Sequence, residues 1–325
     1  MKKRGVLEVQ MHWVFVIIAG AIILAFFIGL VTRQRAVARK ELIFDISNDL
    51  NLIISGARVT EGSITEIEIP NIEINFGCQD YWIEGQKKSL AGKPIFASDK
   101  IIGNNILLWT LAWNMPFKVD NFVYATSPQV RFVFLDPPDA LYKKIPDKIN
   151  KEKVSKFDDL QDKGNYKIKF ILFNKNPLQL AFPGWIKEYD AVAVSVYEDK
   201  IEYYNFKNKW EKKGTSVYLG EESLLGAFFT DNVDDYNCIM DKAVRELNTV
   251  AKIYAERTRL LDKSNVCPLF YGDANIELLN SLAEETSGEL KFSTGKIRID
   301  AIKGSATSLR TLNRDIEFQS CPVIY

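Results

Sequence analysis

The sequence predicts an α+β protein in which an amino-terminal transmembrane helix continues into a long helix and then into a globular head. Three patterns indicate this class: an uncharged apolar run over residues 9–32, a period-two alternation that begins at Thr65, and helical periodicity over 234–261. With 325 residues, 47% of them hydrophobic, the chain is long enough and apolar enough to bury a substantial core.

The apolar run reads MHWVFVIIAGAIILAFFIGLV over residues 11–31, and no charged residue occurs between Val9 and Thr32. A helix rises 1.5 Å per residue, so about 20 such residues cross the hydrocarbon core of a bilayer. Trp13 lies near one end of the run, where an amphipathic ring prefers the headgroup level. We therefore expect residues 9–32 to span a lipid bilayer once, after a short basic head over residues 1–8.

A juxtamembrane helix is expected over residues 33–58. This stretch contains no proline, and its only glycine is Gly56. After a first step of seven residues, apolar residues recur on one face at alternating steps of three and four, which is typical of a packed helix. They are Ala36, Ile43, Ile46, Leu50, Ile53 and Ala57. This face either packs on the chain's own head or supports self-association through helix 36–57, and the sequence leaves both interpretations open.

Residues 59–128 are predicted to form a β-rich module. Alternating apolar and polar residues over 65–76 indicate two short strands with a turn or bulge at Pro70. The run NNILLWTLAWN, residues 104–114, is apolar on both faces, so we expect a central strand that is covered on both sides.

Residues 129–325 are predicted to form an α/β module with a carboxyl-terminal helical pair. Short runs of small and β-branched residues indicate its strands, two of which form a hairpin with a basic loop. Helices are expected at 234–261 and 274–286, the first of which opens with two aspartates at its positive end. The strands are expected near 130–135, 166–173, 191–197, 201–206, 215–219, 290–292 and 296–302.

Four scattered cysteines, none in a CxxC pair, fit two disulfides in an oxidising compartment, with buried free thiols as the alternative. If helix 234–261 is unbroken, Cys238 and Leu261 are roughly 35 Å apart, and the six residues from Leu261 to Cys267 can retrace at most about 20 Å. Cys238 and Cys267 should therefore not pair with each other. The pairings left open are Cys78–Cys238 with Cys267–Cys321, and Cys78–Cys267 with Cys238–Cys321.

Several chemistries are excluded from the head of a single chain. The only histidine is His12, at the membrane, which removes Ser-His-Asp, Cys-His and histidine–metal sites. The sequence contains no GxxxxGK[ST] loop and no GxGxxG after a strand. We assign no catalytic, cofactor-binding or metal-ligating residue. Beyond residue 40 acidic side chains outnumber basic ones, 41 to 35, which argues against nucleic acid as a partner.

The first residues, MKKRG followed by VLE, resemble the leader of type IV prepilins of the archaeal kind, a class III signal. In that family a short basic head is clipped after a small residue, and the hydrophobic helix stays on the mature protein. The resemblance covers about 57 residues and implies a cut between Gly5 and Val6, with Glu8 as the third mature residue. The bacterial pattern has Phe first and Glu fifth, and this chain departs from it. A plain signal anchor is the alternative.

These observations predict a single-pass membrane-anchored protein with an extracytoplasmic head of structural or interaction type, without a cofactor. The alternative is a membrane-tethered α/β enzyme or sensor with a pocket at the carboxyl ends of the strands, near Asp136, Asn174 and Glu198. Three basic residues precede the span and four follow it, so the positive-inside rule assigns no orientation.

Overall fold

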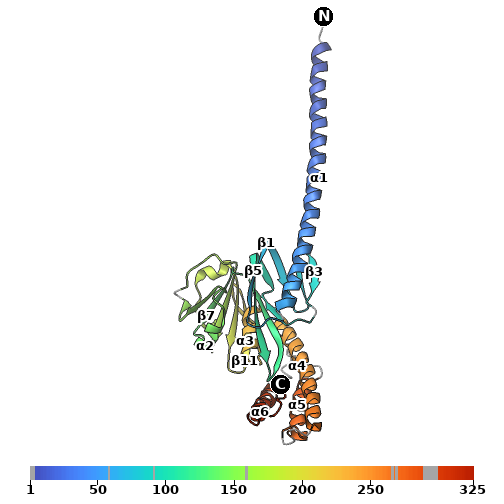
Figure 1. Ribbon diagram of the computed structural model, residues 1–325. Helices are drawn as coiled ribbons and strands as arrows, with labels where there is room; N and C mark the ends of the chain where they lie inside the picture. The colour runs from blue at the N-terminus through green and yellow to red at the C-terminus, as the bar shows by residue number, and fades with distance from the viewer. Residues whose placement is uncertain are drawn as a thin grey trace. The chain divides into compact units, whose positions relative to one another are not determined.

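The computed structural model describes the chain in two compact units, Met1–Leu50 and Asn51–Tyr325. Its architecture is α+β, as expected: a long apolar helix, two sheets and carboxyl-terminal helices (Figure 1). The residues it describes are 4–57, 59–90, 92–157, 160–264, 267, 270–287 and 299–325.

Helix α1, Arg4–Ala57, is a single helix of 54 residues, so it is about 80 Å long. It runs without interruption through both the predicted span and the predicted juxtamembrane helix. Large apolar side chains between Trp13 and Val31 are exposed, with 75% of Phe15 accessible. Within the described residues, α1 is the one helix long and apolar enough to cross a membrane, and it fits a single-pass anchor.

The last two turns of α1 belong to the second unit. Ile54 and Ala57 are buried there, whereas Ile53, predicted to lie on the packed face, is only half-buried. Lys93 donates hydrogen bonds to Asn51 Oδ1 at 3.4 Å and to Ser55 Oγ at 2.5 Å. These contacts fasten the end of the helix to the head.

The first sheet has the strand order β3-β2-β1-β5-β6-β4. β1 carries an irregularity between Glu68 and Ile72, next to Pro70, which has no N–H to donate to a ladder. Residues 106–110 of β5 are all buried, so this central strand is covered on both faces as expected. The bounds are β1 Ile64–Phe76, β2 Asp80–Ile83, β3 Gln86–Ser89, β4 Ile95–Ala97, β5 Lys100–Asn114 and β6 Lys118–Thr126.

The second sheet has the strand order β12-β11-β10-β9-β7-β8. Strands β8, β7, β9 and β10 are parallel, and β11 and β12 complete the sheet as an antiparallel hairpin. The expected basic loop of that hairpin is wrong, because β12 begins at Lys209, directly after Asn208. The bounds are β7 Val130–Leu135, β8 Lys151–Val154, β9 Lys167–Phe173, β10 Asp190–Val196, β11 Lys200–Lys207 and β12 Lys209–Val217.

Six helices and two short 3-10 turns complete the described part of the chain. They are α1, α2 Asp139–Lys144, η2 Pro177–Gln179, η3 Gly184–Glu188, α3 Glu221–Phe229, α4 Val233–Lys263, α5 Asp273–Glu285 and α6 Ile299–Phe318. The strand expected at 296–302 is wrong, because residues 299–302 form the first turn of α6. The alternation in that short run concealed a longer helical period, in which Ile302, Ala306, Leu309 and Ile316 are the buried residues. The strand expected at 290–292 lies outside the described residues.

Helix α3 joins the two sheets into one core (Figure 1). The ring of Phe229 lies 5.2 Å from that of Tyr124 on the first sheet and 5.1 Å from that of Phe132 on the second. Phe228, its neighbour, lies 5.8 Å from Phe134. The predicted modules 59–128 and 129–325 each contain one sheet, and they share this interior.

We predict that Gly226→Ala destabilises the head by about 1–3 kcal/mol. A methyl group at this position of α3 would lie 2.6 Å from the buried ring of Phe96, so the helix or the ring must shift. Denaturant unfolding of the full chain in detergent measures the effect. The control is Gly304→Ala in α6, where nothing lies within 4 Å and the better helix former should stabilise by about 0.5–1 kcal/mol. Equal changes in the free energy of unfolding for Gly226→Ala and Gly304→Ala would contradict the close contact between Gly226 of α3 and the Phe96 ring.

Candidate functional site

A pocket of about 500 Å³ opens where the two sheets meet, at the amino-terminal ends of β9 and β10. The first sheet and its β4–β5 turn line one side, the second sheet lines the other, and Asp231, just after α3, lies between them. The lining residues are Asn75, Asp99, Lys100, Ile102, Tyr166, Lys167, Asp190, Val192, Asn205 and Asp231.

The carboxylate of Asp231 connects three parts of the head. It forms an ion pair with Lys167 of β9, and Lys169 Nζ lies 2.6 Å from its Oδ1. The backbone N–H of Asp99, in the β4–β5 turn, donates to its Oδ2 at 2.9 Å. All three charged side chains are at most 4% exposed. A buried charge is tolerated only with such compensation.

Lys169 also holds the end of α3. Its ammonium group donates to the carbonyl oxygen of Phe229 at 2.5 Å, at the negative end of the helix. The same ammonium lies 5.9 Å from the centre of the Phe132 ring. The side chain therefore crosses the inner face of the second sheet and reaches α3.

The pKa values in this cluster follow from burial and pairing. Burial would raise the pKa of Asp231, but the two neighbouring ammonium groups outweigh it and lower the pKa. Burial opposes the charged form of Lys167, yet the carboxylates of Asp231 and Asp190 raise its pKa above the ordinary value. Burial dominates at Lys169 and lowers its pKa. Asp231 and Lys167 are therefore a charged pair at neutral pH.

Asp99, like Asp190, is a carboxylate of the pocket rim that solvent reaches. Burial by the surrounding protein, followed by the charge of Asp231, raises its pKa to about 6. Its Oδ1 accepts a hydrogen bond from Asn232 Nδ2 at 2.9 Å. Asn232 is also the amino-terminal cap of α4, because its Oδ1 accepts the N–H of Asp235 at 2.8 Å.

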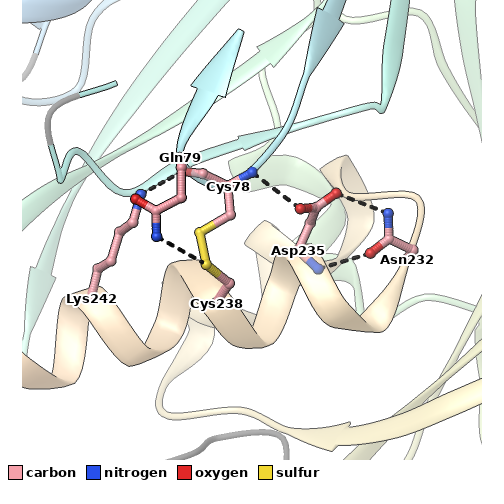
Figure 2. The surroundings of a disulfide bond; sticks show 6 residues. All are labelled: Cys78, Gln79, Asn232, Asp235, Cys238 and Lys242. Atoms are coloured by element: carbon pink, nitrogen blue, oxygen red, sulfur yellow. Dashed lines mark hydrogen bonds between the residues drawn. A yellow bond between two sulfur atoms is a disulfide. The ribbon is translucent and has the colours of Figure 1, made fainter. Parts of the chain in front are cut away.

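The network around Asp99 continues to a disulfide. Cys78 and Cys238 are joined, and the Cys78 N–H donates to Asp235 Oδ1 at 3.1 Å (Figure 2). Lys242, one turn further along α4, donates to the Cys78 carbonyl oxygen, and burial lowers the pKa of this lysine. The first turns of α4 are thereby fixed to the segment between β1 and β2.

The second disulfide joins Cys267 to Cys321, so the structure contains the first of the two pairings that the sequence left open. The bonds close loops with sequence separations of 160 and 54 residues. Each is expected to contribute about 2–4 kcal/mol by restricting the unfolded chain. The two bonds use all four cysteines of the sequence.

The alternative interpretation of the sequence expects a pocket at the carboxyl ends of the parallel strands. Asp136 and Asn174 follow the carboxyl ends of β7 and β9 and adopt left-handed backbone conformations, with φ of 51° and 53°. Asp136 Oδ2 pairs with Lys175 at 2.5 Å, and the carbonyl oxygen of Glu198 accepts the hydroxyl of Tyr218 at 2.6 Å. The pocket described above lies at the opposite, amino-terminal edge.

Sequence reasoning missed the lysine pair of this site, although a signal was present. Lys167 and Lys169 alternate with Ile168 and Phe170 in a strand of a parallel sheet, where both faces are normally apolar. Charged residues at such positions require a buried partner. Nothing near Asp231 identified it as that partner, because 62 residues separate it from Lys169. Gly5 and Val6, the predicted processing residues, lie in the first turns of α1.

No known protein family, no curated protein and no solved structure matches this chain at a significant level. Within the described residues, no three His, Cys, Asp or Glu side chains are grouped to hold a metal ion. The features of the chain that bear on its function are therefore the apolar helix, the disulfides and the pocket.

We predict that Asp99→Asn stabilises the head at pH 8 and has little effect at pH 4. The native pKa of about 6 lies above the ordinary 3.8, so the native state holds the proton more tightly than the unfolded state. Stability is then lost as pH rises through 4 to 6, and asparagine avoids this loss. Because Asp99 is solvent-accessible, we expect only about 1–3 °C in Tm at pH 8.

The control for this measurement is Asp139→Asn on α2. Hydrogen bonding to Lys153 lowers the pKa of the exposed Asp139, so its replacement should not stabilise the head at pH 8. Asp231, Asp235 and Lys167 also act on Asp99 and remain in both variants. A Tm gain at pH 8 that is equal for both variants would show that general charge reduction, and not the environment of Asp99, is responsible.

Proposed function

We propose that this chain is a single-pass membrane-anchored protein whose extracytoplasmic head has a structural or interaction role. The observation that carries the proposal is the combination of one apolar helix with a disulfide-bonded head. α1 exposes a continuous hydrocarbon surface between Trp13 and Val31, and water is a poor solvent for such a surface. Insertion into a bilayer removes that surface from water.

The disulfides support a head on the oxidising side of the membrane. Both cysteine pairs are bonded in the structure, and each bond connects elements that are distant in sequence. Such bonds persist outside the cytosol, where no thiol pool reduces them. The Cys78–Cys238 bond is surrounded by hydrogen bonds that use the backbone of Cys78 as both donor and acceptor (Figure 2).

We further propose a pilin-like amino terminus with self-association through helix 36–57. The basic MKKRG head before the apolar helix supports the first part of this proposal. Ile43, Leu50, Ile54 and Ala57 of this segment are buried, so contact with another copy would use the side chains of the segment that stay exposed. Val37 and Leu42 are exposed beyond the apolar run, with accessible fractions of 59% and 48%.

A membrane-tethered sensor is the second candidate function. The pocket between the sheets favours it, because its size lies within the usual range for small-molecule sites and it brings buried and accessible charges together. Occupancy of the pocket would contact both sheets at once. The orientation of the head decides on which side of the membrane such a sensor would meet its ligand, so it bears on both candidate functions.

The orientation is tested with protease added to intact cells that express the full chain. An extracytoplasmic head is digested from outside, and quantitative alkylation without reductant finds no free thiol. After reduction, all four cysteines should become alkylated. A protease-resistant head in intact cells, together with four alkylatable thiols before reduction, would contradict the proposed address.

Processing is tested separately by mass spectrometry of the amino terminus. In a host that has the class III signal peptidase, the mature chain should begin at Val6, because the basic head ends at the small residue Gly5. Gly5→Leu should abolish the cut while the helix still inserts, and Gly20→Ala is the matched control that should leave it unchanged. An intact Met1 or Lys2 terminus in the wild-type chain would leave a plain anchor.

A further inference from the structure

The pocket between the sheets holds one carboxylate more than its own lysines neutralise. Lys100 Nζ lies 2.9 Å from the carboxylate of Glu73. Lys167 is paired with Asp231 and lies 2.9 Å from Asp190 at the rim. Each of these ammonium groups is therefore already engaged. Within the described residues, a cation that enters the pocket would therefore meet no unpaired ammonium group.

Asp99 is the carboxylate left over. Within the described part of the chain its carboxylate oxygens have an amide partner, Asn232 Nδ2 at 2.9 Å, and no ion-pair partner. The neighbouring negative charge of Asp231 makes this position less favourable for an isolated anion. A cation placed in the pocket beside Asp99 would relieve that repulsion and would gain a charge-assisted hydrogen bond.

Another acceptor in the same pocket lacks a hydrogen-bond donor. The Oδ1 atom of Asn205, on β11, is buried from solvent and has no hydrogen-bond partner in the described residues. Asn205 lies opposite Val192 of β10 and lines the pocket with it. A buried acceptor without a donor costs about 1–3 kcal/mol, which a ligand N–H would recover.

The rest of the lining distinguishes between ligand classes. Ile102 and Val192 give the pocket an apolar wall that suits a short carbon chain. An anionic ligand would be repelled by the unpaired Asp99 carboxylate. A neutral polyol would leave the charge of Asp99 without a counter-charge. One carboxylate and one amide oxygen are too few ligands for Ca²⁺, which takes six to eight oxygens. An organic cation with N–H donors fits all three features.

We propose that this pocket binds a small organic cation that carries a primary ammonium group. The ammonium donates to the Asp99 carboxylate, and the carbon chain contacts Ile102 and Val192. A second N–H of the ligand donates to Asn205 Oδ1 after the side-chain amide of Asn205 rotates to expose that atom to the pocket. Binding requires no change in the paired lysines. The site is a property of the head, and it does not depend on which side of the membrane the head occupies.

The test uses the full chain in detergent with its disulfides intact. 1,4-Diaminobutane is titrated and followed by calorimetry and by saturation-transfer NMR, with 1,4-butanediol as the neutral ligand of equal length. The diamine should bind saturably, and the diol at least about tenfold more weakly, because only the diamine carries a charge. No saturable diamine binding up to 20 mM, taken as about the limit of weak binding, would overturn the proposal.

Two variants locate the site. Asp99→Asn keeps the acceptor for Asn232 but removes the charge, and it should weaken diamine binding at least about tenfold. Asp139→Asn removes an exposed carboxylate on α2, away from the pocket, and should bind as the wild type does. Equal loss in both variants, or no loss in Asp99→Asn, would show non-specific attraction and would overturn the proposal.

Asn205→Ala provides a second test that leaves every charge in place. It removes the unpartnered acceptor and should weaken the diamine about threefold to tenfold without changing the weak binding of the diol by the same factor. Circular dichroism and disulfide mapping confirm that each variant is folded before titration. Should Asp99→Asn not fold, this variant decides, and unchanged diamine affinity in it would overturn the assignment of the pocket.

Discussion

The head depends on one buried carboxylate. Asp231 follows α3 and accepts from Lys167 and Lys169 of the second sheet and from the Asp99 N–H of the first. Removing one partner of a buried ion pair costs about 3–5 kcal/mol, because a charge is left without compensation. Packing of Phe228 and Phe229 brings the sheets together, but apolar packing is non-directional. The hydrogen bonds and ion pairs of the Asp231 carboxylate are directional, so they specify which parts of the two sheets lie together.

Two features of the head adjoin the Asp231 carboxylate: the first turn of α4 and the pocket that opens to solvent. Asn232 donates to Asp99 and caps α4. Asp235, in the first turn of α4, accepts the N–H of Cys78 beside the disulfide (Figure 2). Towards solvent, the same residues border a pocket with a carboxylate that lacks a cation. The groups that hold the sheets together thus also shape the site that a ligand would occupy.

The sequence predicted the fold to the extent that local pattern determines it. The uncharged run before Arg33 and the helical stripe of 234–261 produced correct helices, and the two-sided apolar run of β5 produced a correct central strand. The alternation after Lys296 misled, because a run of seven residues can match a strand while it begins a longer helix. The helix geometry also excluded a Cys238–Cys267 bond, although it could not choose between the remaining pairings.

The site itself was not predictable from local pattern. Lys167, Asp99 and Asp231 lie in three separate segments, and only tertiary packing brings them together. Lys167 and Lys169 in the apolar strand β9 indicate that a buried acidic partner is needed. They do not indicate which acidic residue of the chain that partner is. The strand-end rule for open α/β sheets placed the pocket at the carboxyl edge. The pocket around Asp99 and Asp231 lies at the opposite edge, where residues of both sheets line it.

The most direct test of the central role of Asp231 is native-state hydrogen exchange on Asp231→Asn, with Asp190→Asn at the exposed rim as the control. We predict that Asp231→Asn raises amide exchange in β9 and in residues 95–103 together, because one carboxylate holds both sheets. Asp190→Asn should leave both segments protected, since Lys167 keeps its buried partner. Unchanged protection in Asp231→Asn, or faster exchange confined to one sheet, would contradict the account.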